Sequence, residues 1–291
     1  MSLPGLVRAV VAALVLSTVV GGRAEAAEPP QSAIIAPTSG SRVEVGEPVL
    51  VLGSGDYWRQ WSERVTEFQV SFDGGETWEW GHYSGSSGSE NTPVRYSWAY
   101  DFTPTEPGVY TIVSRVNTDT VYGAISAPTT LYVGVPAPAP SGSCAPCRLD
   151  LGPRNPNRYD DEGRSVSVGL RFSVDRPGFI TGIEHGQEET ANLAHLWRSD
   201  GTLLAQQRVA GGGRNLPFPT PVAVVPGEEY VVDLTLFGGR YVSHDALHTA
   251  TLLQSPFIVP AQGGVYAYDE QFPNLSWHDS NYVVTPVFRT S

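Results

Sequence analysis

The chain contains 291 residues and has a formal net charge of −12 at neutral pH. Such an acidic protein lacks the positively charged surface that binds nucleic acids and anionic membranes, so we expect neither as a partner. Its 31 glycines, 24 prolines and 10% aromatic residues are typical of many short strands joined by turns. All 18 basic residues are arginine, which indicates a GC-rich bacterial genome.

The first 26 residues have the pattern of a secretory signal peptide. Arg8 gives a basic start, residues 9–20 are an apolar run, and Ala24-Glu25-Ala26 is a cleavage site with small residues. The run is short for a membrane span, and no second run of about 20 apolar residues follows. We therefore expect a secreted, extracellular protein without membrane insertion; a retained N-terminal anchor is the alternative.

The remainder divides into two predicted β-sandwich domains, so the expected fold class is all-β. Residues 32–134 form the first domain, residues 135–143 a Pro-rich linker, and residues 144–291 the second domain. Apolar runs and apolar–polar alternation indicate the strands of the first domain. They are expected at residues 49–52, 67–72, 77–80, 96–102 and 107–113.

Residues 70–78, Val-Ser-Phe-Asp-Gly-Gly-Glu-Thr-Trp, resemble the hairpin of bacterial immunoglobulin-like modules, including the dimerisation domain of sulfite oxidases. The resemblance implies an immunoglobulin-like sandwich. It implies no oxidase activity, because nothing in the chain resembles a molybdenum-cofactor domain. Tyr110 follows a Pro-Gly corner and is expected to have the structural role of a tyrosine corner.

Trp58 and Trp61 lie in an aromatic loop of the first domain, at residues 56–62. Both are candidate ligand-binding residues, because exposed rings stack on sugars or dock a partner. The alternative is that they cover the end of the sandwich.

Cys144 and Cys147 are the only cysteines and begin the second domain. A disulfide between them is expected in a secreted protein. A redox site would need a helix after a strand, and a zinc site would need two further ligands at matched spacing.

The second domain is predicted to be a jelly-roll-like sandwich of about eight strands. A hairpin is expected at Asp200-Gly201. The strands are expected at residues 166–172, 179–185, 193–198, 203–209, 222–225, 229–236, 264–268 and 282–288.

A series of markers carries a second resemblance: Cys-Ala-Pro-Cys (144–147), Ser-Val-Gly-Leu-Arg-Phe (167–172), Gly-Phe-Ile-Thr-Gly-Ile (178–183), His-Leu-Trp (195–197) and Ser-Asn-Tyr (280–282). The second domain resembles an uncharacterised bacterial domain family of extracellular proteins. No catalytic residues are implied. Relatives usually have Arg-Phe-Tyr-Lys at residues 184–187 and Tyr at Trp277. The altered segment and the Trp277 turn are therefore candidates for recognition.

Two further patterns suggest chemistry. His244 and His248 have the spacing of a helical zinc-protease motif, but strand and turn residues precede them, so we interpret them as a solvated loop and expect no enzyme. The acidic clusters at residues 160–162 and 269–270 offer oxygens for a structural calcium; solvated turns are the favoured interpretation. We expect no other cofactor.

Aromatic residues with polar neighbours are the remaining candidates. Tyr241 and the polar turn of Trp277, His278 and Asp279 have the residue types of a sugar platform, whereas Trp197 and Tyr282 lie in strand markers and are interpreted as core. The favoured function is a non-catalytic module that binds a polysaccharide or cell-wall glycan. The alternative is an extracellular structural protein that contacts a protein partner.

Overall fold

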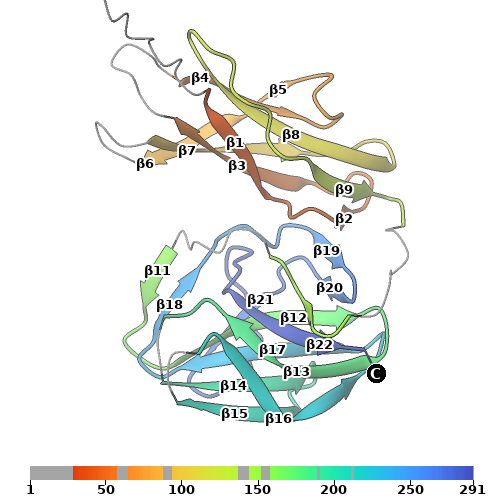
Figure 1. Ribbon diagram of the computed structural model, residues 1–291, viewed down its shortest axis with the longest axis vertical. Helices are drawn as coiled ribbons and strands as arrows, with labels where there is room; N and C mark the ends of the chain where they lie inside the picture. The colour runs from red at the N-terminus through yellow and green to blue at the C-terminus, as the bar shows by residue number, and fades with distance from the viewer. Residues whose placement is uncertain are drawn as a thin grey trace, which may run out of the picture.

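The computed structural model describes residues 29–57, 65–87, 94–136, 144–151, 158–188, 191–210 and 213–290. Every regular element in these ranges is a β-strand, and the strands form layered sheets in two parts of the molecule (Figure 1). The expected all-β sandwich class is confirmed. The predicted signal peptide, linker residues 137–143, Trp58 and Trp61 lie outside the described residues.

The N-terminal part has two sheets packed face to face. One has the strand order β1 (Gln31–Ala36), β3 (Val49–Tyr57), β7 (Val94–Phe102), β6 (His82–Ser87). The other has the order β2 (Ser41–Val43), β9 (Thr129–Val133), β8 (Gly108–Thr118), β4 (Val65–Ser71), β5 (Glu79–Trp80).

The Trp98 side chain, from β7, is fully buried in the N-terminal core. A Cβ atom at Gly53 would lie only 2.0 Å from its ring, so the neighbouring strand leaves room for the indole by having glycine there. Tyr110 donates a hydrogen bond to the carbonyl oxygen of Glu106 at 2.9 Å, which is the contact that a tyrosine corner makes.

The C-terminal part is a larger sandwich. One sheet has the order β10 (Cys147–Arg148), β22 (Val284–Arg289), β13 (Gly178–His185), β16 (Asn215–Val224). The facing sheet has the order β15 (Leu203–Ala210), β14 (Ala191–Arg198), β17 (Glu229–Leu236), β12 (Val166–Val174), and β12 also pairs with β20 (Phe257–Val259) and β21 (Gly264–Tyr268).

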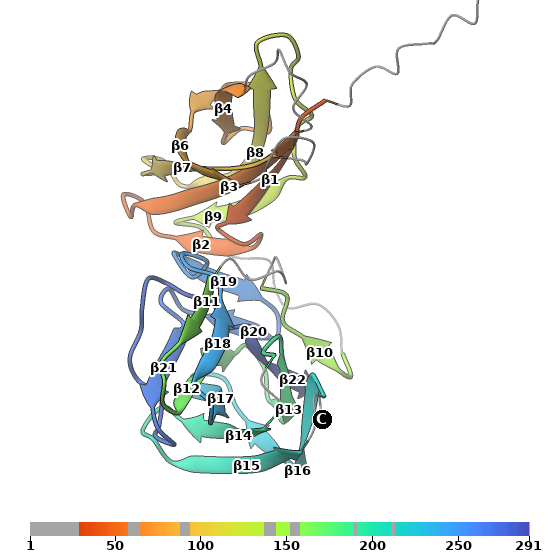
Figure 2. The same ribbon diagram turned by 90° about the vertical axis from the view of Figure 1, so that its left-hand side faces the viewer.

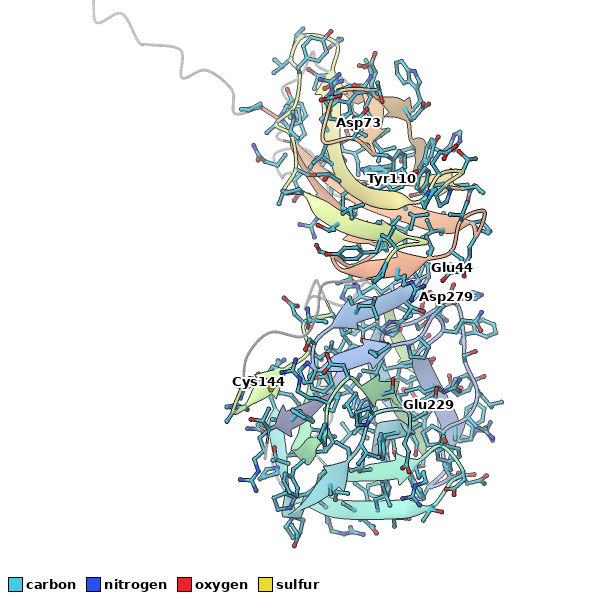
Figure 3. All side chains as sticks on the ribbon, turned by 90° about the vertical axis from the view of Figure 1, so that its right-hand side faces the viewer. Glu44, Asp73, Tyr110, Cys144, Glu229 and Asp279 are labelled. Carbon is cyan, nitrogen blue, oxygen red and sulfur yellow. A yellow bond between two sulfur atoms is a disulfide. The ribbon has the colours of Figure 1, made fainter. Side chains whose placement is uncertain are left out.

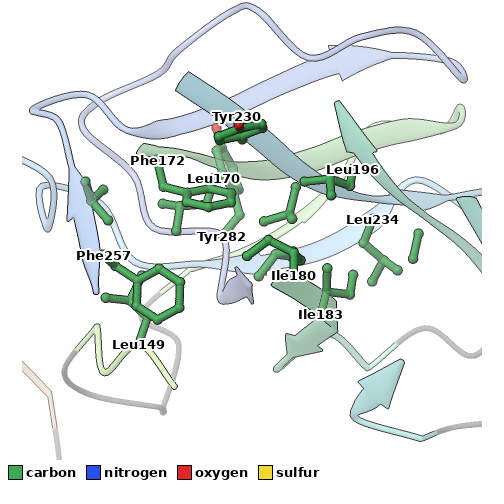
Figure 4. Close-up of a cluster of buried hydrophobic side chains, with 14 of the residues drawn as sticks. Leu149, Leu170, Phe172, Ile180, Ile183, Leu196, Tyr230, Leu234, Phe257 and Tyr282 are labelled. Atoms are coloured by element: carbon green, nitrogen blue, oxygen red, sulfur yellow. The ribbon is translucent and has the colours of Figure 1, made fainter. Parts of the chain in front are cut away.

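The core of this part lies between the two sheets, where large apolar side chains meet (Figure 4). Phe172, Ile180 and Tyr282 are among its buried members, so the interpretation of Tyr282 as core is confirmed. The disulfide between Cys144 and Cys147 is also confirmed, and Cys147 packs in the same core.

The two parts meet through a pair of short strands, β2 and β19 (Thr251–Gln254). They pair antiparallel, with Thr251 opposite Arg42 and Leu252 opposite Ser41. Both views show β2 and β19 facing each other where the parts meet (Figures 1 and 2). One sheet therefore continues from one sandwich into the other.

Candidate functional site

A two-stranded ribbon on the flank of the C-terminal part forms the centre of the candidate site. It consists of β11 (Arg158–Asp161) and β18 (Arg240–Ser243), in antiparallel register (Figure 1). Side chains alternate between the faces of a strand. One face therefore carries Tyr159 and Asp161 beside Val242 and Arg240, and the other carries Arg158 and Asp160 beside Tyr241 and Ser243.

A pocket of about 420 Å³ lies against this ribbon. The Tyr159 side chain, on its rim, is 66% exposed. The lining combines two aromatic rings with charged groups of both signs, and it consists of Tyr159, Asp160, Asp161, Glu188, Arg240, Tyr241 and Val242. An exposed ring beside convergent polar groups is the usual composition of a small-ligand site.

Tyr241, one of the predicted site residues, lies at this pocket with its ring half-buried. Its hydroxyl donates to a carboxylate oxygen of Glu162 at 3.2 Å, and its ring meets Tyr282 edge-on at 5.8 Å. Burial, followed by the negative charge of Asp160, raises the pKa of the Tyr241 hydroxyl. The hydroxyl therefore stays protonated and acts as a fixed donor.

The opposite face of the ribbon connects to the Trp277 turn through Asp245. Arg158 contacts Asp160 and also donates to Asp245 at 3.2 Å. The other oxygen of Asp245 accepts from the Ser280 hydroxyl at 2.9 Å, and the His278 ring lies 3.9 Å from Asp245. Asp245 thus joins two loops and a strand that are far apart in the chain.

The Trp277 turn presents an aromatic surface to solvent. Trp277 is 49% exposed and stacks on the His278 ring, with 4.2 Å between ring centres. His278 and Asp279 both have left-handed backbone conformations, at φ 48° and 50°. Asp279 lies on the side of the C-terminal part that faces the N-terminal part (Figure 3). Trp277 and His278 are therefore linked through Asp245 to Arg158 of the ribbon.

Residues 152–284 match the family model described as Domain of unknown function (DUF4082). An uncharacterised domain in this half of the chain is what the sequence markers predicted. The match includes the ribbon, the pocket and the Trp277 turn, and it begins after the disulfide. No curated protein matches the chain. Among the described residues, no helix has the length and apolar character needed to cross a membrane.

The segment at residues 184–187, which the sequence suggested for recognition, has a mainly structural role. Glu184 forms an ion pair with Arg148 at 3.0 Å, while His185 and Gln187 are buried. His185 and Glu184 do line a second, smaller pocket of about 80 Å³. The buried amide of Gln187 bonds to the backbone of β18, so the segment supports the ribbon rather than forming an open recognition loop.

The interpretation of His244 and His248 as a solvated loop is wrong with respect to burial. The segment is a loop, as expected, but the two side chains are only 4% and 2% exposed. Their backbone N–H groups donate to Asn281 and Asp279 at 2.8 and 2.9 Å. Burial lowers the pKa of both imidazoles, that of His248 to about 4. They are therefore neutral packing groups behind the Trp277 turn at neutral pH.

The acidic cluster at residues 160–162 is bound by protein donors. Arg158 holds Asp160, a backbone N–H of Gly163 donates to Asp161 at 3.0 Å, and Glu162 accepts from the hydroxyls of Tyr241 and Tyr268. Within the described ranges, no three His, Cys, Asp or Glu side chains come together as metal ligands. A structural calcium stays a prediction from the sequence.

Proposed function

We propose that the protein is a secreted, non-catalytic module that binds a polysaccharide or cell-wall glycan at the β11–β18 ribbon. The observation that carries the proposal is the pocket in which the exposed ring of Tyr159 stands beside carboxylates and the guanidinium of Arg240. A flat ring covers the apolar face of a pyranose, and charged planar groups bind its hydroxyls.

The Trp277 turn supplies a second aromatic surface. Its connection to the ribbon through Asp245 and Arg158 fixes one ring platform relative to the other. Two fixed platforms suit an extended chain of sugars better than a single monosaccharide. The left-handed residues His278 and Asp279 hold the turn in a conformation that is costly for non-glycine residues, which is common at ligand sites.

The hydrogen-bond partners of the carboxylates favour binding over hydrolysis. Glycosidases require one carboxylic acid to hold a proton and a second carboxylate at a defined separation. At the ribbon, Asp160 is paired with Arg158, and Glu162 accepts from two tyrosine hydroxyls. These carboxylates are already engaged by protein donors, and no pair at a defined separation is assigned to acid and nucleophile roles, so the proposal is for binding.

A panel of immobilised polysaccharides tests the proposal. Tyr159→Ala and Trp277→Ala should each weaken retention of the bound glycan about tenfold, which corresponds to about 1.4 kcal/mol. Tyr122→Ala is the matched control, because Tyr122 is 74% exposed but lies in the N-terminal part. Failure of the wild-type protein to bind any glycan, or equal losses in all three variants, would contradict the proposal.

The exposed aromatic corner of the N-terminal sandwich favours a second candidate function, contact with a protein partner. Trp80 on β5 and Tyr83 on β6 are both 57% exposed and lie on strands at sheet edges. Exposed edges and large aromatics are characteristic of protein contacts. Light scattering of the wild-type protein and of Trp80→Ala tests this candidate. The candidate requires an assembly that the wild-type protein forms and the variant loses. A wild-type protein that stays a strict monomer and recovers no partner would count against it.

A further inference from the structure

The pocket at the ribbon has an unbalanced charge. Asp161 and Glu188 both line it, and Arg240, opposite Asp161 in the ribbon, is the cation that the described lining residues contribute. The third lining carboxylate, Asp160, is already paired with Arg158. Among the described lining residues, two carboxylates therefore face one guanidinium, and negative charge is in excess.

The two carboxylates are accessible to a ligand. Asp161 and Glu188 are exposed, and the Asp161 carboxylate accepts a hydrogen bond from the backbone N–H of Gly163 at 3.0 Å. Among the described residues, the Glu188 carboxylate has no hydrogen-bond or ion-pair partner. A ligand cation would thus meet oxygens that keep free lone pairs.

The charges around the pocket add to its negative charge. Glu162, one residue beyond β11, adds a carboxylate, and the nearby cation Arg164 is stacked over the Tyr268 ring at 3.5 Å. The whole chain has a net charge of −12. A negative pocket in a negative protein repels anionic ligands and attracts cationic ones.

We propose that this pocket selects glycans with protonated amino groups, such as polymers of glucosamine, over neutral glycans and over glycans with carboxylates or phosphates. The inference rests on the proposed glycan-binding function and names its ligand class. Tyr159 supplies the stacking surface for any pyranose, and Asp161 with Glu188 binds the amine.

Titration calorimetry with three oligosaccharides of equal length tests the proposal. A β-1,4-glucosamine oligomer and its fully N-acetylated form share one backbone and differ in charge, and an oligogalacturonate is the anion. We expect the amine form to bind about tenfold more tightly than the acetylated form, the anion to bind most weakly, and added salt to reduce the amine preference.

Conservative variants locate the effect. The double variant Asp161→Asn/Glu188→Gln should bind the amine form no better than the acetylated form. Glu270→Gln, at an exposed acid of the same domain, is the control and should keep the full preference. Tyr159→Ala should weaken both oligomers alike.

Two outcomes would overturn the inference and leave the proposed function standing: equal binding of the amine and acetylated oligomers, or an amine preference that survives in the double variant and so arises from overall charge. A failure of all three oligosaccharides and of the wider polysaccharide panel would instead remove the proposed function itself.

Discussion

The side-chain amide of Gln187 pairs with the backbone of Val242 in the way that a neighbouring strand would. The Val242 N–H donates to Oε1 of Gln187, and Nε2 of Gln187 donates to the Val242 carbonyl oxygen, both at 2.8 Å. Nε2 also donates to the carbonyl oxygen of Tyr282 at 2.5 Å. One buried side chain thus holds the ribbon against the segment that precedes β22.

The variant Gln187→Glu should loosen the ribbon, because a carboxylate has no N–H group and would face two backbone carbonyl oxygens in a buried position. Losing two donors there should cost about 2 to 3 kcal/mol in the free energy of unfolding. Urea unfolding measures the loss, and hydrogen exchange at the Val242 amide localises it.

Gln206→Glu is the control for this experiment, because Gln206 is exposed on β15. Its stability should stay within about 0.5 kcal/mol of the wild type. If Gln187→Glu were equally harmless, the amide would not be what holds β18 in place.

The sheets were more predictable from the sequence than the site. The strands predicted at residues 229–236 and 264–268 coincide with β17 and β21. Long apolar or alternating runs indicate directly which side chains are buried. The short strands β2, β11 and β19 were not predicted. β2 and β11 pair with strands that are distant in the chain, so no local pattern marks them.

Site residues could be predicted from the sequence only where a local pattern indicates their exposure or burial. The polar surroundings of Trp277 indicated its exposure, and the structure confirms it. Tyr159 had no such signal, because its exposure depends on pairing with β18 about 80 residues later. The burial of His248 was also missed, since the Asp279 turn that covers it lies in another loop.

Acid should destabilise the protein through His248. The unfolded imidazole titrates at its ordinary pKa of 6.5, whereas burial lowers the folded pKa to about 4. Between these values the unfolded state binds more protons, so the free energy of unfolding falls as the pH is lowered, by about 3 kcal/mol for this group. The loss should begin below about pH 6.5 and be complete near pH 4.

Urea unfolding between these pH values checks the effect. His248→Gln should flatten the pH dependence, and a residual slope is expected because burial also lowers the pKa of His244. His82→Gln, at an exposed position on β6, should keep the wild-type slope. An unchanged slope in His248→Gln would show that the acid sensitivity lies elsewhere.

The junction between the two sandwiches can be tested at a pair of matched glycines, Gly40 and Gly46. Both have left-handed backbone conformations, at φ +94° and +84°. A Cβ atom at Gly40 would lie 2.9 Å from the carbonyl oxygen of Leu253, whereas a Cβ atom at Gly46 would have nothing within 4 Å. Alanine should therefore impose similar backbone strain at both positions, about 1 kcal/mol, and a steric conflict only at Gly40.

The expected result is a larger loss of stability in Gly40→Ala than in Gly46→Ala, together with faster hydrogen exchange at the Leu253 amide, which donates to the Gly40 carbonyl oxygen at 3.1 Å. The difference between the variants isolates the contact between the parts, because the strain is common to both. Equal losses, with unchanged exchange at Leu253, would mean that the β2–β19 pairing does not hold the sandwiches together.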